Sequence, residues 1–222
     1  MQAELARRRV WDLPTRLLHW LLVALFAFSW WSAENHAMDW HRWSGYGVLG
    51  LLLFRLYWGL VGSTTARFAS FVRGPRAFFA YARRLLQRPG PITPGHNPMG
   101  GWSVLALLAL LLVQVGTGLF ATDTDGLESG PLASKISYSL SRDFAEVHEI
   151  SFNLLLALVG LHVAVVLFYW VYKRENLIAA MLSGDKRLPA APELARLRFE
   201  GWRRALPGVL IAAAIVWAIV RS

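Results

Sequence analysis

Four long apolar runs constrain the fold of this chain more than any other feature. They cover Leu17–Trp31, Tyr46–Val61, Trp102–Ala121 and Ile150–Tyr172, and a shorter fifth run covers Leu206–Val220. An α-helix needs about 20 mostly apolar residues to cross a hydrocarbon core of roughly 30 Å, and the first four runs reach this length with their flanking residues. The fifth run makes only about 22 Å of helix. The sequence therefore predicts an all-α integral membrane protein, a four-helix transmembrane bundle with a fifth C-terminal helix of marginal length.

The loops between these runs differ in charge. The net charge is +9, which in a soluble protein would suggest nucleic acid, but here the basic residues lie between spans and we expect no such partner. Segments 1–16, 63–100 and 173–205 are rich in Lys and Arg, whereas 122–146 carries five acidic and two basic residues. An excess of Lys and Arg marks cytoplasmic loops. We therefore expect a multi-pass protein of the bacterial inner membrane with a cytoplasmic N-terminus.

Residues 1–182 are expected to form the bundle, and residues 183–222 a C-terminal extension that includes the fifth helix. Two basic stretches, 67–88 and 192–204, mix aromatic residues with arginine and are typical of helices that lie in the lipid headgroup plane. A docking surface for a partner is the alternative. The intervening loop contains Asn97–Pro98, which suits an N-cap followed by the first helical position, although the adjacent His96 leaves a quinone or headgroup site open.

Four of the six histidines fall at two depths of the predicted bundle. His148 and His162 are fourteen residues apart, which places them on one side of a helix and about 21 Å apart along its axis. His41 lies at the outer start of the second helix, and His19 lies about 9 Å in from the inner end of the first. The outer level therefore holds His41 and His148, and the inner level holds His19 and His162.

Paired imidazoles inside a membrane point to a ligand, because ionisable groups there are costly. Interhelical hydrogen bonding is the alternative reading. Zinc prefers four tetrahedral ligands, and no Cys or acidic residue completes either level. Haem iron needs only two axial protein ligands, so each level predicts one haem b with bis-histidine ligation. The chain contains no cysteine, which excludes c-type haem attachment within it.

Two arginines are candidates for the haem propionates. Arg55 lies fourteen residues after His41, on the same side of its helix and at the inner depth, where a charged group pairs with an anion. Snorkelling to the headgroups is the alternative for Arg55. Arg16, one turn before His19, is a weaker candidate. Glycines that make room for a flat macrocycle, or that serve plain helix packing, are Gly45, Gly47, Gly50, Gly116, Gly118 and Gly160.

Five motifs carry a family resemblance: VWDLPTRLLHW, HRWSGYGVLG, FRLYWGLVGS, GHNPMGGWS and HEISFNLLLALVGLH. Together they resemble the bacterial cytochrome b561 and nickel-hydrogenase b-type cytochrome family over about residues 10–182. The resemblance implies a four-helix bundle that holds two b-type haems and exchanges electrons with the quinone pool. It also implies the haem ligands His19, His41, His148 and His162, in agreement with the depths above.

These features favour electron transfer between a periplasmic partner, such as a c-type cytochrome or a hydrogenase-like protein, and ubiquinone or menaquinone. The alternative within the family is a superoxide:ubiquinone oxidoreductase. The acidic outer loop favours a cationic protein over the superoxide anion. A membrane metal transporter that uses the same histidines is a third hypothesis, and the absorbance spectrum of dithionite-reduced protein separates it, since only haem gives sharp α bands. The quinone type and the direction of electron flow stay open.

The depth pairing makes a spectroscopic prediction. We expect His19→Ala and His162→Ala to remove one and the same haem component, because both residues hold one iron. His41→Ala and His148→Ala should remove the other component. A potentiometric titration of the α band in each variant measures this, and loss of the same component in His19→Ala and His41→Ala would contradict the pairing.

Overall fold

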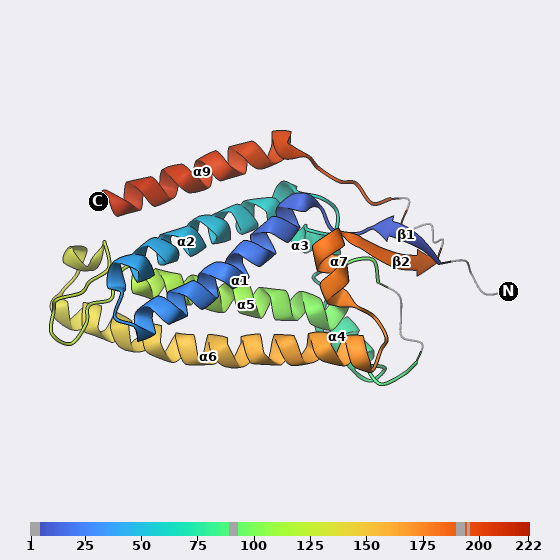
Figure 1. The fold of residues 1–222 in the computed structure, drawn as a ribbon, viewed down its shortest axis with the longest axis horizontal. Helices are drawn as coiled ribbons and strands as arrows, with labels where there is room; N and C mark the ends of the chain where they lie inside the picture. Colours follow the sequence, from blue (N-terminus) through green and yellow to red (C-terminus); the bar gives the residue numbers. More distant parts are fainter. Residues whose placement is uncertain (1–4, 89–92, 190–193, 195) are drawn as a thin grey trace. The chain divides into compact units, whose positions relative to one another are not determined.

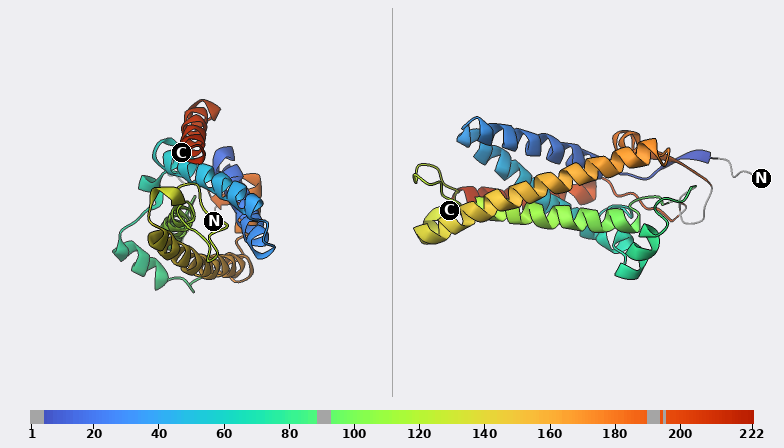
Figure 2. Two further views of the ribbon diagram at one scale, coloured as in Figure 1. Left: turned by 90° about the vertical axis from the view of Figure 1, so that its left-hand side faces the viewer. Right: turned by 90° about the horizontal axis from the view of Figure 1, so that it is seen from below.

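The apolar runs all form helices. The structure, a computed structural model, describes residues 5–88, 93–189, 194 and 196–222. The spanning helices are α1 (Leu13–Glu34), α2 (Met38–Val61), α5 (Pro98–Gly118), α6 (Tyr138–Val171) and α9 (Trp202–Val220), shown in Figures 1 and 2. Within the described residues, these five are long and apolar enough to cross a membrane. The predicted all-α membrane fold with a fifth C-terminal helix is therefore confirmed.

The fifth helix is longer than its apolar run. It has 19 residues, or about 28 Å, because Trp202–Ala205 adds a first turn. Most of its large apolar side chains are exposed, and Leu210 and Trp217 are each 60% exposed, as expected for a surface that faces lipid. Its length and composition are therefore those of a membrane span.

The described residues divide into two units. The first comprises the described parts of Met1–Leu17, Leu56–Ala106 and Gly160–Ala205, and the second comprises Leu18–Arg55, Leu107–Val159 and Leu206–Ser222. Each long helix contributes one end to each unit.

The second unit is a helical bundle held by close polar and aromatic contacts. The hydroxyls of Ser29 on α1 and Ser44 on α2 are 2.6 Å apart. Phe26 on α1 stacks on Phe152 of α6 with ring centres 6.1 Å apart. At Gly50 on α2, an added Cβ would lie 3.7 Å from Val216 of α9. Helices α1, α2, α6 and α9 therefore pack together in this unit.

The first unit contains a small sheet that the sequence analysis did not predict. Strands β1 (Leu5–Arg9) and β2 (Asp185–Pro189) pair antiparallel, next to the short helix α7 (Leu177–Ser183). Their sequences, LARRR and DKRLP, lack the apolar alternation that marks a half-buried strand. One face of the sheet packs through Leu188 into a cluster with Val10, Trp11 and Ala180. The long-range pairing therefore outweighs the weak local signal.

The predicted headgroup-plane stretch 67–88 forms two short helices, α3 (Phe68–Phe71) and α4 (Pro75–Ala82), rather than one. Of the second stretch, residues 192, 193 and 195 lie outside the described residues. Residues 197–201 form no helix, which differs from the prediction.

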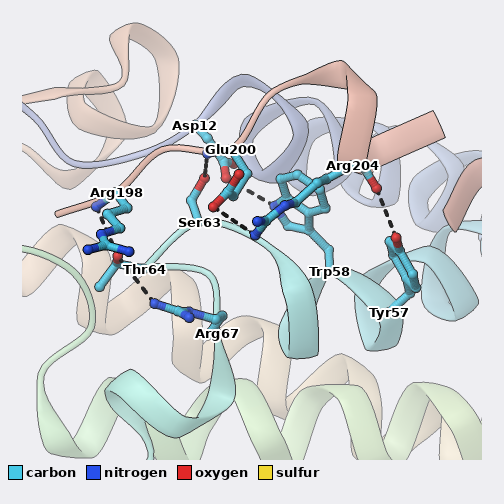
Figure 3. Close-up of polar contacts among 9 residues, drawn as sticks. All are labelled: Asp12, Tyr57, Trp58, Ser63, Thr64, Arg67, Arg198, Glu200 and Arg204. Atoms are coloured by element: carbon cyan, nitrogen blue, oxygen red, sulfur yellow. Dashed lines mark hydrogen bonds and ion pairs between the residues drawn. The ribbon is translucent and has the colours of Figure 1, made fainter. Parts of the chain in front are cut away.

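The backbone of residues 198–200 pairs with a loop instead of forming a helix (Figure 3). Thr64 N donates to Arg198 O at 2.9 Å, and Arg198 N donates to Thr64 Oγ1 at 3.0 Å. Glu200 N donates to Ser63 Oγ at 2.9 Å. These bonds fix the segment that leads into α9.

Helix α6 starts earlier than its apolar run. The hydroxyl of Ser137 accepts a hydrogen bond from Leu140 N at 3.4 Å, and α6 then runs through 34 residues from Tyr138. The predicted outer loop 122–146 therefore ends at residue 137 and includes the short 3-10 helix η1 (Ala133–Lys135). His148 consequently lies three turns inside α6, not at its outer end. Polar residues permit a helix wherever water or headgroups surround it, and apolar length alone could not locate this start.

Asp12 fixes the start of α1 in the first unit. Its Oδ1 accepts a hydrogen bond from Thr15 N at 2.7 Å, and its Oδ2 accepts one from Trp58 Nε1 at 3.0 Å (Figure 3). Asp12 and Trp58 are both fully buried. The carboxylate therefore caps α1 and ties its start to the end of α2.

This contact predicts a specific coupling. Asp12→Asn keeps an oxygen for Thr15 but turns an amide NH₂ toward the Trp58 donor, so we expect it to lower the free energy of unfolding by about 1–3 kcal/mol. In a Trp58→Phe background, the same substitution should cost clearly less, because the indole donor is gone. Thermal unfolding in detergent measures both. An equal cost in the two backgrounds would contradict the contact.

Candidate functional site

The second unit brings His41 and His148 together. Their ring centres are 6.1 Å apart, and the ring planes are nearly perpendicular at 84°. A metal–imidazole bond is about 2 Å long and a ring nitrogen lies about 1 Å from the ring centre, so two imidazoles on opposite sides of one metal ion have centres about 6 Å apart. The separation of the two rings fits two axial ligands of one iron.

Both rings are oriented by a backbone carbonyl. His41 Nδ1 lies 2.9 Å from Ser29 O, and His148 Nδ1 lies 2.8 Å from Gln114 O. A carbonyl oxygen only accepts, so Nδ1 carries the proton in both rings and the lone pair is on Nε2. Metal-binding histidines almost always donate their second N–H to such a partner, which fixes the tautomer and the ring orientation. Both side chains therefore have the chemistry of Nε2 ligands.

The side chain of Gln114 forms a contact that is consistent with the same tautomer of His148. Its amide nitrogen lies 3.0 Å from His148 Nε2, where it donates to the lone pair, and its Oε1 accepts a hydrogen bond from Ser151 Oγ at 2.5 Å. Thr117 Oγ1 lies 3.4 Å from His148 Nδ1. Binding of iron at His148 Nε2 requires the Gln114 amide to turn away from it.

The glycines near the two histidines serve different purposes. At Gly118, an added Cβ would lie 2.8 Å from His148 Cε1, so the ring needs a glycine there. At Gly47, an added Cβ would lie 2.9 Å from Leu25 Cδ1, so this glycine allows a close approach of α1 and α2. Among the described atoms, none lies within 4 Å of a Cβ built at Gly45, one turn beyond His41. Gly45 therefore leaves room beside His41 on its own side of α2.

The predicted inner ligands lie in different units. His19 is half-buried on α1 in the second unit, where its ring meets the ring of Trp20 at 5.1 Å. His162 is half-buried on α6 in the first unit, fourteen residues after His148. Their pairing stays a prediction that rests on sequence depth.

The two candidate arginines have different surroundings. Arg55 is only 5% exposed and lies on the same side of α2 as the buried Ser44, Val48 and Leu52. Arg16 donates from Nε to Met181 O at 3.3 Å and from a terminal nitrogen to Leu182 O, so it holds the last turn of α7. Arg16 thus has a structural role, and a propionate contact of either arginine stays a prediction.

The predicted helix start at Asn97–Pro98 is confirmed. Asn97 Oδ1 accepts a hydrogen bond from Gly100 N at 2.8 Å, and Pro98 is the first residue of α5. The ring of His96 packs between Trp11 and Phe71, with ring centres 4.8 and 4.7 Å away. His96 therefore has a packing role in the first unit.

The sequence analysis missed a polar chain that starts at the same cap. Asn97 Nδ2 donates to the hydroxyl of Tyr169 at 2.8 Å, and this hydroxyl lies 2.8 Å from that of Tyr81. Burial raises the pKa of the Tyr81 phenol, which keeps it protonated. Two tyrosines 88 residues apart give no local pattern that could have predicted this contact.

A metal site of another kind is not evident. In the parts of the chain that the structure describes, no group of three or more His, Cys, Asp or Glu side chains could hold a metal ion.

Comparison with known proteins identifies the family. The model of prokaryotic cytochrome b561 matches residues 10–184. The chain belongs to the prokaryotic cytochrome b561 family. This cytochrome is also similar to a protein of Azotobacter chroococcum mcd 1 named "Probable Ni/Fe-hydrogenase B-type cytochrome subunit", with 24% identity over 209 residues that cover 79% of this chain and 86% of that protein. No solved structure matches it.

The general function of the protein follows from its membership of this family. The protein is a multi-pass membrane b-type cytochrome that takes part in electron transfer, and the family implies that it binds b-type haem. The pair His41 and His148 fits this group by ring separation and by tautomer.

The contact between Gly118 and His148 makes a prediction. Gly118→Ala places a methyl group against the ring of His148, so we expect it to lower the haem content of the purified cytochrome. Gly74→Ala, at the N-cap of α4 and outside the glycines expected to make room for a haem, is the control, since no described side chain or distant backbone atom lies within 4 Å of its Cβ. The ratio of haem to protein in the two variants measures the difference, and equal ratios would contradict the role of Gly118.

Proposed function

We propose that this cytochrome carries electrons across the bacterial inner membrane between a periplasmic redox partner and the quinone pool of the respiratory chain. His41 and His148 would hold one haem b, and His19 and His162 would hold a second. The observation that carries the proposal is the pair of neighbouring outer imidazoles, with ring centres 6.1 Å apart and each held by a carbonyl at Nδ1.

Bis-histidine ligation favours electron transfer over oxygen chemistry. A bound haem b supplies one-electron chemistry through its iron. Imidazoles on both sides leave no open position for O₂. His41 and His148 are neutral ligands whose orientation is fixed by Ser29 O and Gln114 O, so they need little rearrangement when the charge of the site changes.

Arg55 supports this proposal from within α2. The guanidinium of Arg55 is 5% exposed and lies at the inner depth of the predicted bundle. A haem propionate is an anion and matches the planar fork of arginine. We include this contact in the proposal.

The outer surface favours a cationic protein partner. In the second unit, the cation Arg42 is held by Asp39 at 2.5 Å and by Glu128, and Arg142 donates to Thr122 O at 2.6 Å. The remaining exposed charges of this outer region are mainly acidic and include Asp125, Asp143 and Glu146. Such a surface attracts a basic protein and repels superoxide.

The remaining parts of the proposal rest on the sequence. Loop charge places the N-terminus in the cytoplasm, and the substrate quinone is ubiquinone or menaquinone. Residues 1–182 form the haem-binding bundle, and residues 183–222 form the extension that adds β2 and α9 to it.

The acidic charge of the outer surface allows an experiment to distinguish a protein electron donor from superoxide. Stopped-flow mixing of oxidised cytochrome with a reduced, basic c-type cytochrome should give fast haem reduction at low salt. We expect a triple variant, Asp125→Asn, Asp143→Asn and Glu146→Gln, to react about tenfold more slowly. High salt should remove the difference, which is the internal control.

Mixing with superoxide in the same instrument tests the alternative. Slow haem reduction is expected, because the acidic outer surface repels the anion. Reduction near the diffusion limit would instead assign the protein to superoxide oxidation.

A further inference from the structure

The exposed face of the β1–β2 sheet gathers arginines. In the antiparallel register, Arg7 lies directly opposite Arg187, and Arg9 lies two residues along the same face. All three residues are exposed. Like charges directly opposite each other destabilise an antiparallel pair. This face therefore carries a repulsion that an anion would relieve.

Among the described residues, the compensation on this face is weak. Arg7 Nε lies 3.4 Å from Asp185 Oδ2, but the two side chains are 72% and 33% exposed, so water and salt screen the pair. The guanidinium of Arg9 lies 4.9 Å from the centre of the Phe199 ring, which positions it without neutralising it. In the described part of this face, three arginines and one aspartate leave an excess of two positive charges.

The opposite face of the sheet is packed, so the strands cannot rotate to separate the arginines. Leu188 is 5% exposed and joins the cluster of Val10, Trp11 and Ala180. Lys186, 8% exposed, is neutralised by Glu175 at 2.5 Å. The register is thereby fixed, and Arg7 and Arg187 stay opposite each other.

In the sequence, strand β1 of the sheet lies only a few residues before the first membrane-spanning helix. Strand β1 ends at Arg9, and the spanning helix α1 begins at Leu13 (Figure 1). Four residues reach at most about 14 Å. The headgroup layer extends roughly 5–8 Å beyond the hydrocarbon core on each side. Long arginine side chains at this distance reach the level of the lipid phosphates.

We propose that Arg7, Arg9 and Arg187 form a binding site for the phosphate headgroup of an anionic phospholipid. Guanidinium forks bind phosphate oxygens in pairs, and a phosphodiester between Arg7 and Arg187 removes their mutual repulsion. The site ties the sheet, and with it the start of α1, to the lipid surface. It is independent of the haem ligands and of the redox partner.

Thermal unfolding in dodecyl maltoside tests the site with phosphatidylglycerol as the probe. Wild-type protein should gain several degrees in Tm with phosphatidylglycerol and little with phosphatidylcholine. In Arg7→Gln/Arg187→Gln, this gain should fall at least threefold. Without added lipid, the same variant should unfold no earlier than wild type, because the repulsion is gone. That second readout shows that the variant folds.

Arg73→Gln/Arg76→Gln is the matched control, since these two exposed arginines lie in the same unit beside α4. It should keep the full gain. An equal gain in Arg7→Gln/Arg187→Gln, or an equal gain with phosphatidylcholine, would overturn the proposal. If inorganic phosphate at the same concentration stabilises wild type as strongly, the site binds free anions and the assignment to lipid is wrong.

Discussion

The hydrogen bonds from Nδ1 of His41 and His148 to backbone carbonyls are the interactions on which the proposed haem site of this cytochrome depends. Each bond fixes the tautomer, leaves the lone pair on Nε2, and ties the ring to a neighbouring helix: His41 to α1 and His148 to α5. Because the acceptors belong to helix backbones, the ligand geometry is set by helix packing. Small residues such as Gly118 are then required where a ring meets the next helix.

The start of α1 and the end of α2 are organised by a different kind of contact. A buried carboxylate, Asp12, caps α1 and accepts the indole proton of Trp58, while Arg16 holds the last turn of α7. The two strands then clamp the segment before α1 against the segment after α7. These polar and packing contacts fix the start of the first span, and the exposed arginines of the sheet face outward from it.

The sequence was sufficient for the features that depend on local patterns. Apolar length located the five spans, Asn97–Pro98 located the start of α5, and histidine spacing brought out His41 and His148 as one level. The sequence did not predict the features that depend on non-local contacts or on polar interactions. The β1–β2 pairing joins segments about 180 residues apart without apolar alternation. The early start of α6 involves a cap by Ser137. The structural role of the Asp12 carboxylate depends on its hydrogen bond from Trp58, a residue distant in the sequence. The inner pair, His19 and His162, still rests on spacing alone.

Haem quantification combined with low-temperature electron paramagnetic resonance tests the central claim most directly. Purified, oxidised protein expressed with ample haem supply should contain two b-type haems per chain, both low-spin as expected for two imidazole ligands. A colourless protein, or a high-spin signal from a haem with one histidine ligand, would contradict clamping of iron between paired imidazoles.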